Sequence, residues 1–200
     1  MEDNIFTNVW VGLITSFLGG YVLAVFLALN RLMPFLKFKS TGVIKVFKDQ
    51  KKANDAMSKD IKKSKTLCVL AMKGDTFSNP ENPLSVVLKD TGIKQMFLIS
   101  SAQNPYLTKR ATELKIDNMA DCVEFSVNNL NTAKKANHNI EIKRHNEVVR
   151  FRIILLSDYL YLSFQEVNIP GKKSPILKIE KDSSVYKCFS SLFDDLWAKY

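Results

Sequence analysis

The 200-residue sequence contains only three cysteines and two histidines, which leaves few residues for metal or disulfide chemistry. Cys68, Cys122 and Cys188 lie far apart, without the short spacing of a zinc site, and their odd number is typical of reduced thiols among apolar neighbours. Glycine is also scarce, and KGDT at 73–76 has too few glycines for a phosphate-binding loop. We therefore expect no metal, no cofactor and no catalytic residues.

Basic residues are missing from the start of the chain, and no charged residue lies between positions 9 and 29. This uncharged run of 21 residues is long enough for a helix to cross a hydrocarbon core of roughly 30 Å. The acidic start differs from the basic start of a secretory signal peptide, so we predict a retained transmembrane anchor within residues 1–36. The basic residues that follow Asn30 predict a single-pass inner-membrane protein whose C-terminal domain is cytoplasmic and whose N-terminus is outside.

Small residues recur at every fourth position along this run. They are Gly12, Ser16, Gly20, Ala24 and Ala28. Residues four apart share one face of a helix, and small side chains let two helices pack closely in lipid. We predict that the helix self-associates through this face. The alternative is that small residues are simply common in membrane helices.

Residues 37–200 have the length of one domain, in which apolar segments alternate with helical ones. Strands are predicted at 42–47, 66–72, 93–100, 139–145, 148–156 and 159–165. Helices are predicted at 48–64, from Asn82-Pro83, from Asn104-Pro105, at 128–137 and from about Ser183. The later strands follow one another too closely for helical crossovers, so we predict an α/β domain with a mixed sheet.

The motifs GVIKVF and FDDLW, which begin and end this domain, together with ISSAQNPYLTKRA, make it resemble one half of the phospholipase D superfamily. The resemblance covers most of residues 42–198 and implies an N-terminal transmembrane helix followed by a phospholipase D-like mixed-sheet domain. It also implies a catalytic H-x-K motif followed by an aspartate and then an asparagine.

The position that corresponds to this catalytic motif reads RFRIILLSDYLYLSFQEVN, where Arg150 and Arg152 replace the histidine and the lysine. Arginine stays protonated and cannot act as the nucleophile, so the resemblance implies an inactive site. Arg150, Arg152 and Asn168 are then candidates for binding an anion, because guanidinium groups make bidentate contacts with phosphate. The alternative is that the two arginines are solvated and pair with Glu141 or Glu147.

Six lysines fall on one side of the helix predicted at 48–64, when successive residues are placed 100° apart. They form what we call the lysine face: Lys48, Lys51, Lys52, Lys59, Lys62 and Lys63. Ala53, Met57 and Ile61 lie opposite, and only Asp55 interrupts the face. Such a face fits anionic lipid, the phosphates of a nucleic acid or an acidic partner, and it also fits a helix whose lysines are merely solvated.

Three classes of function remain. The first is a membrane effector or signalling protein whose inactive domain binds a cytoplasmic partner, including a partner that carries nucleic acid. Its transmembrane helices would cluster, as in bacterial antiviral systems. The second is a membrane-bound phosphodiesterase or nuclease, and the third is a passive anchor for a soluble partner. We favour the first class, with membrane lipid and a second copy of the chain as further partners. Direct contact with nucleic acid stays open.

Overall fold

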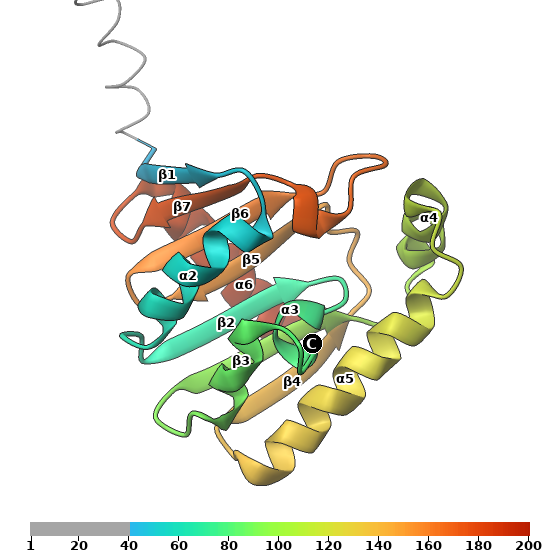
Figure 1. Ribbon diagram of the computed structural model, residues 1–200, viewed down its shortest axis with the longest axis horizontal. Helices are drawn as coiled ribbons and strands as arrows, with labels where there is room; N and C mark the ends of the chain where they lie inside the picture. Colours follow the sequence, from blue (N-terminus) through green and yellow to red (C-terminus); the bar gives the residue numbers. More distant parts are fainter. Residues whose placement is uncertain (1–40) are drawn as a thin grey trace, which may run out of the picture. The chain divides into compact units, whose positions relative to one another are not determined.

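Seven strands form one mixed sheet in residues 41–200, the part of the chain that this computed structural model describes (Figure 1). The strands are β1 (Val43–Phe47), β2 (Thr66–Ala71), β3 (Lys94–Ser100), β4 (Ile140–His145), β5 (Phe151–Leu156), β6 (Tyr159–Phe164) and β7 (Ile176–Glu180). Their order across the sheet is β1-β7-β6-β5-β2-β3-β4. The sheet is therefore wide, and its central strand, β5, comes late in the sequence.

The sheet has a parallel half and an antiparallel half, which meet between β2 and β5. Strands β2, β3 and β4 run parallel, whereas β5, β6, β7 and β1 pair with their neighbours antiparallel. Residues 67–71 of β2 form an uninterrupted apolar run, as expected for a strand that is covered on both faces. The carboxyl ends of the parallel strands, where ligands bind in open α/β sheets, lie at one edge of the sheet together with the start of β5.

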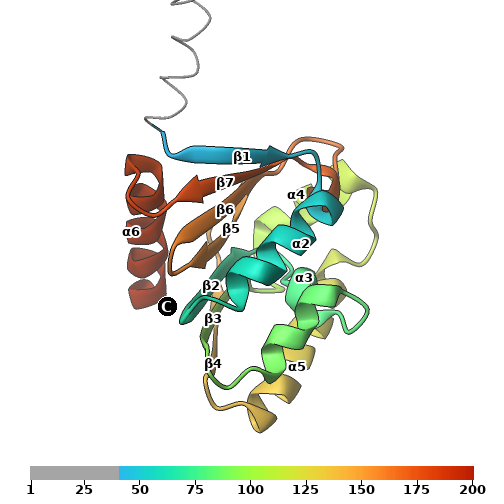
Figure 2. The ribbon, with the colours of Figure 1, turned by 60° about the vertical axis from the view of Figure 1, so that its left-hand side comes forward.

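Helices cover both faces of this sheet. Those described are α2 (Gln50–Ile61), α3 (Asp75–Ser78), α4 (Pro105–Leu114), α5 (Met119–Ala136), α6 (Ser184–Lys199) and the 3-10 helices η1 (Pro83–Lys89) and η2 (Gly171–Lys173). Figure 2 shows α2, α3 and α5 on one face and α6 on the other. Each face has its own apolar core, with Met57 and Phe97 fully buried in one and Leu98 and Phe193 in the other.

The predicted helix starts are explained by their caps. The side chain of Asp49 accepts a hydrogen bond from the backbone N–H of Lys52, and that of Asn104 accepts one from Tyr106. Pro105 follows Asn104 at the first helical position, where its missing N–H has no cost. These caps satisfy backbone donors that the helix itself leaves free, so α2 and α4 begin within two residues of their predicted positions.

The prediction of an α/β domain with a mixed sheet is confirmed, but some elements, among them the short helices α3 and η2, were not predicted or differ from the prediction. β7 was not predicted, because lysine and glutamate follow its apolar residues and its pattern is short. The segment that begins at Asn82-Pro83 forms the 3-10 helix η1 and no α-helix. α5 begins at Met119, nine residues before the predicted start at 128, because Val123 and Val127 extend its apolar face.

No helix in residues 41–200 is long and apolar enough to cross a membrane. The longest described helix, α5, has 18 residues and carries charged side chains such as Asp121 and Lys134. The predicted fold class is therefore corrected from a transmembrane helix joined to a phospholipase D-like domain to a mixed α/β domain. The predicted anchor, residues 1–36, and its small-residue positions lie outside the described residues. The inner-membrane localisation, which depended on that anchor, is not carried further.

Candidate functional site

A cavity of about 440 Å³ lies where the parallel and antiparallel halves of the sheet meet. It opens beside the carboxyl end of β2, at the start of β5 and at the end of β6. We call it the Arg152 cavity, and its polar lining includes Gln50, Lys73, Asp75, Thr76, Arg110, Arg152, Ser163, Gln165 and Lys172. Apolar residues such as Met72, Leu114 and Met119 line the rest. The volume and the mixed lining are typical of a site for a small molecule.

Arg152 is a cation of this cavity that is held by neutral groups. It lies on β5, opposite Ser163 on β6, and is partly buried. Its guanidinium donates one hydrogen bond to Oγ1 of Thr76 at 2.9 Å and another to Oε1 of Gln50. Burial lowers the pKa of Arg152 to about 10, and the charge of Asp75 opposes this shift. Arg152 therefore remains charged at neutral pH, although its surroundings disfavour the charge.

The two acceptors of Arg152 are themselves fixed. Gln50 and Thr76 are both 6 % exposed, and the amide nitrogen of Gln50 donates to Oδ1 of Asn54 at 2.7 Å. This donation turns the carbonyl oxygen of Gln50 toward Arg152. Both acceptors are neutral, so they orient the guanidinium without neutralising it. An arginine has five N–H donors, and only two of those of Arg152 donate a hydrogen bond to a described residue.

The other charges of the cavity have partners. Nζ of Lys73 lies 3.5 Å from a carboxylate oxygen of Asp75, and Arg110 is paired with Glu113 at 2.7 Å. Lys172 is exposed at the rim. Of the cations inside the cavity, Arg152 is therefore the one that forms no ion pair with a described carboxylate.

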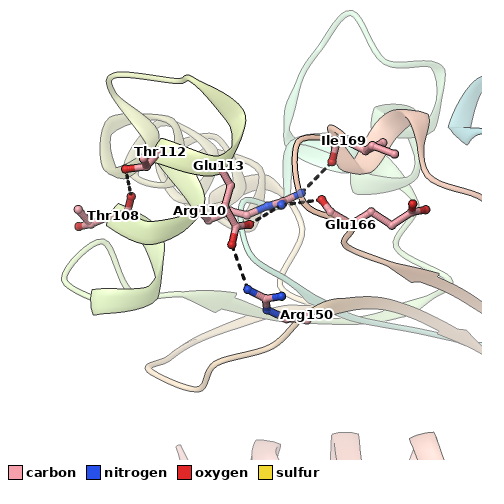
Figure 3. A network of polar contacts seen from close by, with 7 residues as sticks. All are labelled: Thr108, Arg110, Thr112, Glu113, Arg150, Glu166 and Ile169. Atoms are coloured by element: carbon pink, nitrogen blue, oxygen red, sulfur yellow. Dashed lines mark hydrogen bonds and ion pairs between the residues drawn. The ribbon is translucent and has the colours of Figure 1, made fainter.

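The loop that follows β6 forms one wall of the cavity, and Arg110 holds this loop in place. Arg110 is only 2 % exposed, and it donates to the backbone oxygens of Glu166 and Ile169, each at 2.8 Å (Figure 3). Glu113, one turn further along α4, receives Arg110 on one oxygen and Arg150 on the other. The hydrogen bond from Arg110 and the nearby charge of Arg150 lower the pKa of the Glu113 carboxyl, although its desolvation acts the other way. This network ties the loop to α4.

One further polar group of the cavity is left without a hydrogen bond in the part of the chain that is described. Oε1 of Gln165 is buried and has no partner, and Ser163, a residue 4 % exposed, places its hydroxyl in the same lining. Buried polar atoms are normally satisfied, and unsatisfied ones in a cavity are available to a ligand or to water. Both residues line the same cavity as Arg152.

The three residues predicted to bind an anion do not lie together. Arg152 lines the cavity, whereas Arg150 is 45 % exposed by side chain, pairs with Glu113 at 3.0 Å and lies over the ring of Tyr106. Its partner is Glu113, and neither Glu141 nor Glu147, which were considered from the sequence, pairs with it. Asn168 is exposed, has a positive φ of 62° and is not among the residues that line the cavity.

The lysine face is exposed as predicted. All six lysines are exposed, while the opposite side of α2 buries Ala53, Met57 and Ile61. None of the six forms an ion pair with another described residue. Among residues 41–200, no group of three potential ligands is placed to hold a metal ion.

Several residues of the site were not found from the sequence. Gln50, Thr76 and Gln165 are neutral, belong to elements far apart in the chain and match no motif. Arg110 did give a signal, because it lies three residues after Leu107 and four before Leu114, on the apolar side of α4. A charged residue in an apolar helical stripe indicates a buried, paired charge.

Comparisons with known proteins return little. No family model matches the sequence, and no curated protein matches it. Among solved structures, the chain is similar to TrmBL2, described as an archaeal chromatin protein with a novel mode of DNA binding. The match has 16% sequence identity and a TM-score of 0.48, and it covers 97% of this chain and 67% of that chain. At these values the likeness carries no argument about what this chain binds.

The predicted phospholipase D resemblance is wrong, because neither a family model nor a curated protein of that superfamily matches the sequence. The motifs behind it were short and unspecific. GVIKVF forms the edge strand β1, and FDDLW lies in the amphipathic helix α6, and both are common elements of α/β domains. The interpretation of Arg150 and Arg152 as substitutes for catalytic residues is withdrawn with it, as is the description of the domain as a degenerate phospholipase.

Proposed function

We propose that residues 41–200 form a binding domain for a small molecule that carries an anionic group, a phosphate or a carboxylate. The strongest support is the environment of Arg152. This cation lies inside a cavity, and the two groups that accept its hydrogen bonds are both neutral. A partly buried charge that forms no ion pair is costly, even with the charge of Asp75 nearby, and an anion bound against it would offset that cost.

The rest of the cavity suggests the shape of the ligand. Charge-assisted hydrogen bonds from the free N–H groups of Arg152 would hold the anionic group. The Ser163 hydroxyl and the unsatisfied Gln165 carbonyl would orient a polar part of the ligand, because one can donate and the other can accept. Leu114, Met119 and other apolar lining residues would cover an apolar body.

The proposal concerns binding and signalling, and turnover is not part of it. The expectation that the chain is not an enzyme, and that it acts through a partner, remains a prediction. Clustering through the small residues of the first 36 positions is not included, since it depended on the membrane anchor.

Calorimetric titration of the full chain tests the proposal. The probes are inorganic phosphate, phenyl phosphate and benzoate, which separate the anionic group from the apolar body. We expect the phenyl-bearing anions to bind more tightly than phosphate, and Arg152→Gln to weaken binding by about tenfold or more, the loss expected for one charge-assisted contact. Arg144→Gln is the matched control, because Arg144 pairs with Glu124 and does not line the cavity. Equal binding by the two variants, or no binding of any probe, would contradict the proposal.

A further inference from the structure

The lysine face of α2 is an unusual surface because the acidic residues of the same helix do not neutralise it. Asp60 is turned inward, where its Oδ2 lies 2.6 Å from Nζ of Lys178 and accepts a hydrogen bond from the hydroxyl of Tyr161. Asp49 caps the start of the helix, with Oδ1 2.9 Å from the backbone nitrogen of Lys52. Asp55 is left as the exposed acid on the basic side.

Four lysines elsewhere in the described chain, Lys73, Lys94, Lys178 and Lys199, each form an ion pair with a carboxylate, whereas others, such as Lys134 and Lys135, form none. The lysine face differs from these scattered unpaired lysines because its six members lie together on one side of a single segment. On the lysine face, six exposed lysines form none. Like charges so close together repel one another and destabilise a helix slightly, so a face of this kind is stabilised when a polyanion binds to it.

The face is also rigidly mounted. α2 buries Ala53 and Met57 completely and Ile61 almost completely, which fixes its orientation on the sheet. Figure 2 shows α2 on the face of the sheet opposite α6. Within α2 the face runs from Lys51 to Lys59, about 12 Å at a rise of 1.5 Å per residue, and Lys48, Lys62 and Lys63 flank the two ends of the helix. A duplex carries one negative charge per about 1.7 Å of its axis, so a face of this length can meet several phosphates at once.

From these observations we infer that the lysine face of α2 binds the phosphate backbone of a nucleic-acid duplex without reading its sequence. Lysine acts as a point charge on phosphate, and contacts of this kind position a protein without specifying bases. No aromatic residue lies between Lys48 and Lys63, so the face lacks the stacking platform that single strands require. This inference concerns a surface different from the Arg152 cavity, and neither depends on the other.

The test is fluorescence anisotropy of the full chain with a labelled 20-base-pair duplex over a range of salt concentrations. We expect sequence-independent binding whose log–log slope against salt lies between about −3 and −6, as expected for three to six phosphate contacts. The variant Lys52→Glu/Lys59→Glu/Lys63→Glu should lower the affinity by about tenfold or more at low salt and reduce the slope by about three. Its circular dichroism should match that of the parent, because these lysines point away from the buried side of α2.

A control variant with the same net charge is Lys134→Glu/Lys135→Glu/Lys187→Glu, whose three lysines are exposed on α5 and α6. It should bind the duplex much as the parent does. Asp55→Lys, which completes the face, should bind more tightly than the parent and so exclude misfolding as the cause of any loss. The inference is overturned if the two triple variants weaken binding equally, if Asp55→Lys has no effect, or if the parent does not bind at low salt. It is also overturned if poly-glutamate binds as tightly as the duplex, which would indicate an acidic protein partner.

Discussion

Arg110 and Glu113 lie one turn apart on α4 and form an ion pair of 2.7 Å in which the arginine is 2 % exposed. The same guanidinium donates to two backbone oxygens of the loop after β6, so one buried side chain connects α4, the loop and the cavity wall (Figure 3). Removing the arginine would leave one oxygen of Glu113 and two backbone carbonyls without their hydrogen-bond donor, since Arg150 contacts only the other oxygen of Glu113.

We therefore expect Arg110→Met to lower the free energy of unfolding by about 3–5 kcal/mol, the usual cost of breaking a buried pair by removing one partner. Urea denaturation measures this loss, and hydrogen exchange should show faster exchange in residues 165–170. Arg150→Gln is the control, because Arg150 is 45 % exposed by side chain and should cost within about 1 kcal/mol. If Arg110→Met is as mild as its control, Arg110 does not hold the loop.

Gly74 makes the turn between β2 and α3 at the floor of the cavity, with a φ of +77°. A Cβ atom there would lie 2.9 Å from Cδ1 of Ile99, so Gly74→Ala combines backbone strain with a steric contact. We expect it to cost about 1–3 kcal/mol in thermal or urea unfolding. Gly171→Ala, at the opposite wall, meets no atom within 4 Å and should be nearly neutral. Similar effects of the two changes would contradict this description of the turn.

Acid should destabilise the domain through His145, which is 2 % exposed at the end of β4. Burial lowers the pKa of His145 below its usual value of about 6.5, with the charge of Glu147 acting in the opposite direction. Below about pH 6.5 the unfolded chain then binds more protons at this residue than the folded chain. The stabilisation from a neutral His145 is present above that pH and is lost as pH falls toward the lower folded value.

The measurement for His145 is the free energy of unfolding from pH 7.5 to pH 5 in the parent and in His145→Asn. Asparagine keeps an acceptor for the backbone N–H of Glu147, which now donates to Nδ1 of His145 at 3.2 Å, but it does not titrate. We expect the difference between the two curves to grow as pH falls below about 6.5. Parallel curves across the range would show that His145 has no part in the acid sensitivity.

The three thiols should differ in reactivity, contrary to the expectation that all three lie in the core. Cys188 is exposed, whereas Cys68 and Cys122 are partly buried. Burial, with the nearby charge of Asp194, raises the pKa of Cys68 to about 12, so almost no thiolate forms there at pH 8. Mass spectrometry after brief iodoacetamide treatment should find Cys188 modified and Cys68 intact. Equal modification of the two thiols would contradict this assignment.

The sequence predicted the sheet better than the site, and the reason is physical. Apolar periodicity and the Asn104-Pro105 cap are local signals, so the main strands and α4 could be read directly. The Arg152 cavity instead combines neutral side chains from α2, α3 and β6. It is recognised as a candidate anion site because neutral groups, and no paired carboxylate, hold Arg152. Only the folded structure shows that Arg150 forms an ion pair with Glu113, whereas Arg152 forms none with a described carboxylate.

The cavity as an anion site is tested most directly by the stability of Arg152→Gln with and without phenyl phosphate. In chloride alone the variant should unfold within about 1 kcal/mol of the parent or be more stable, because it removes a partly buried cation that forms no ion pair with a described carboxylate. Saturating phenyl phosphate should raise the Tm of the parent and leave that of the variant unchanged. The account is contradicted if the variant loses 2 kcal/mol or more in chloride, as expected for a structural arginine, and both proteins respond equally to the anion.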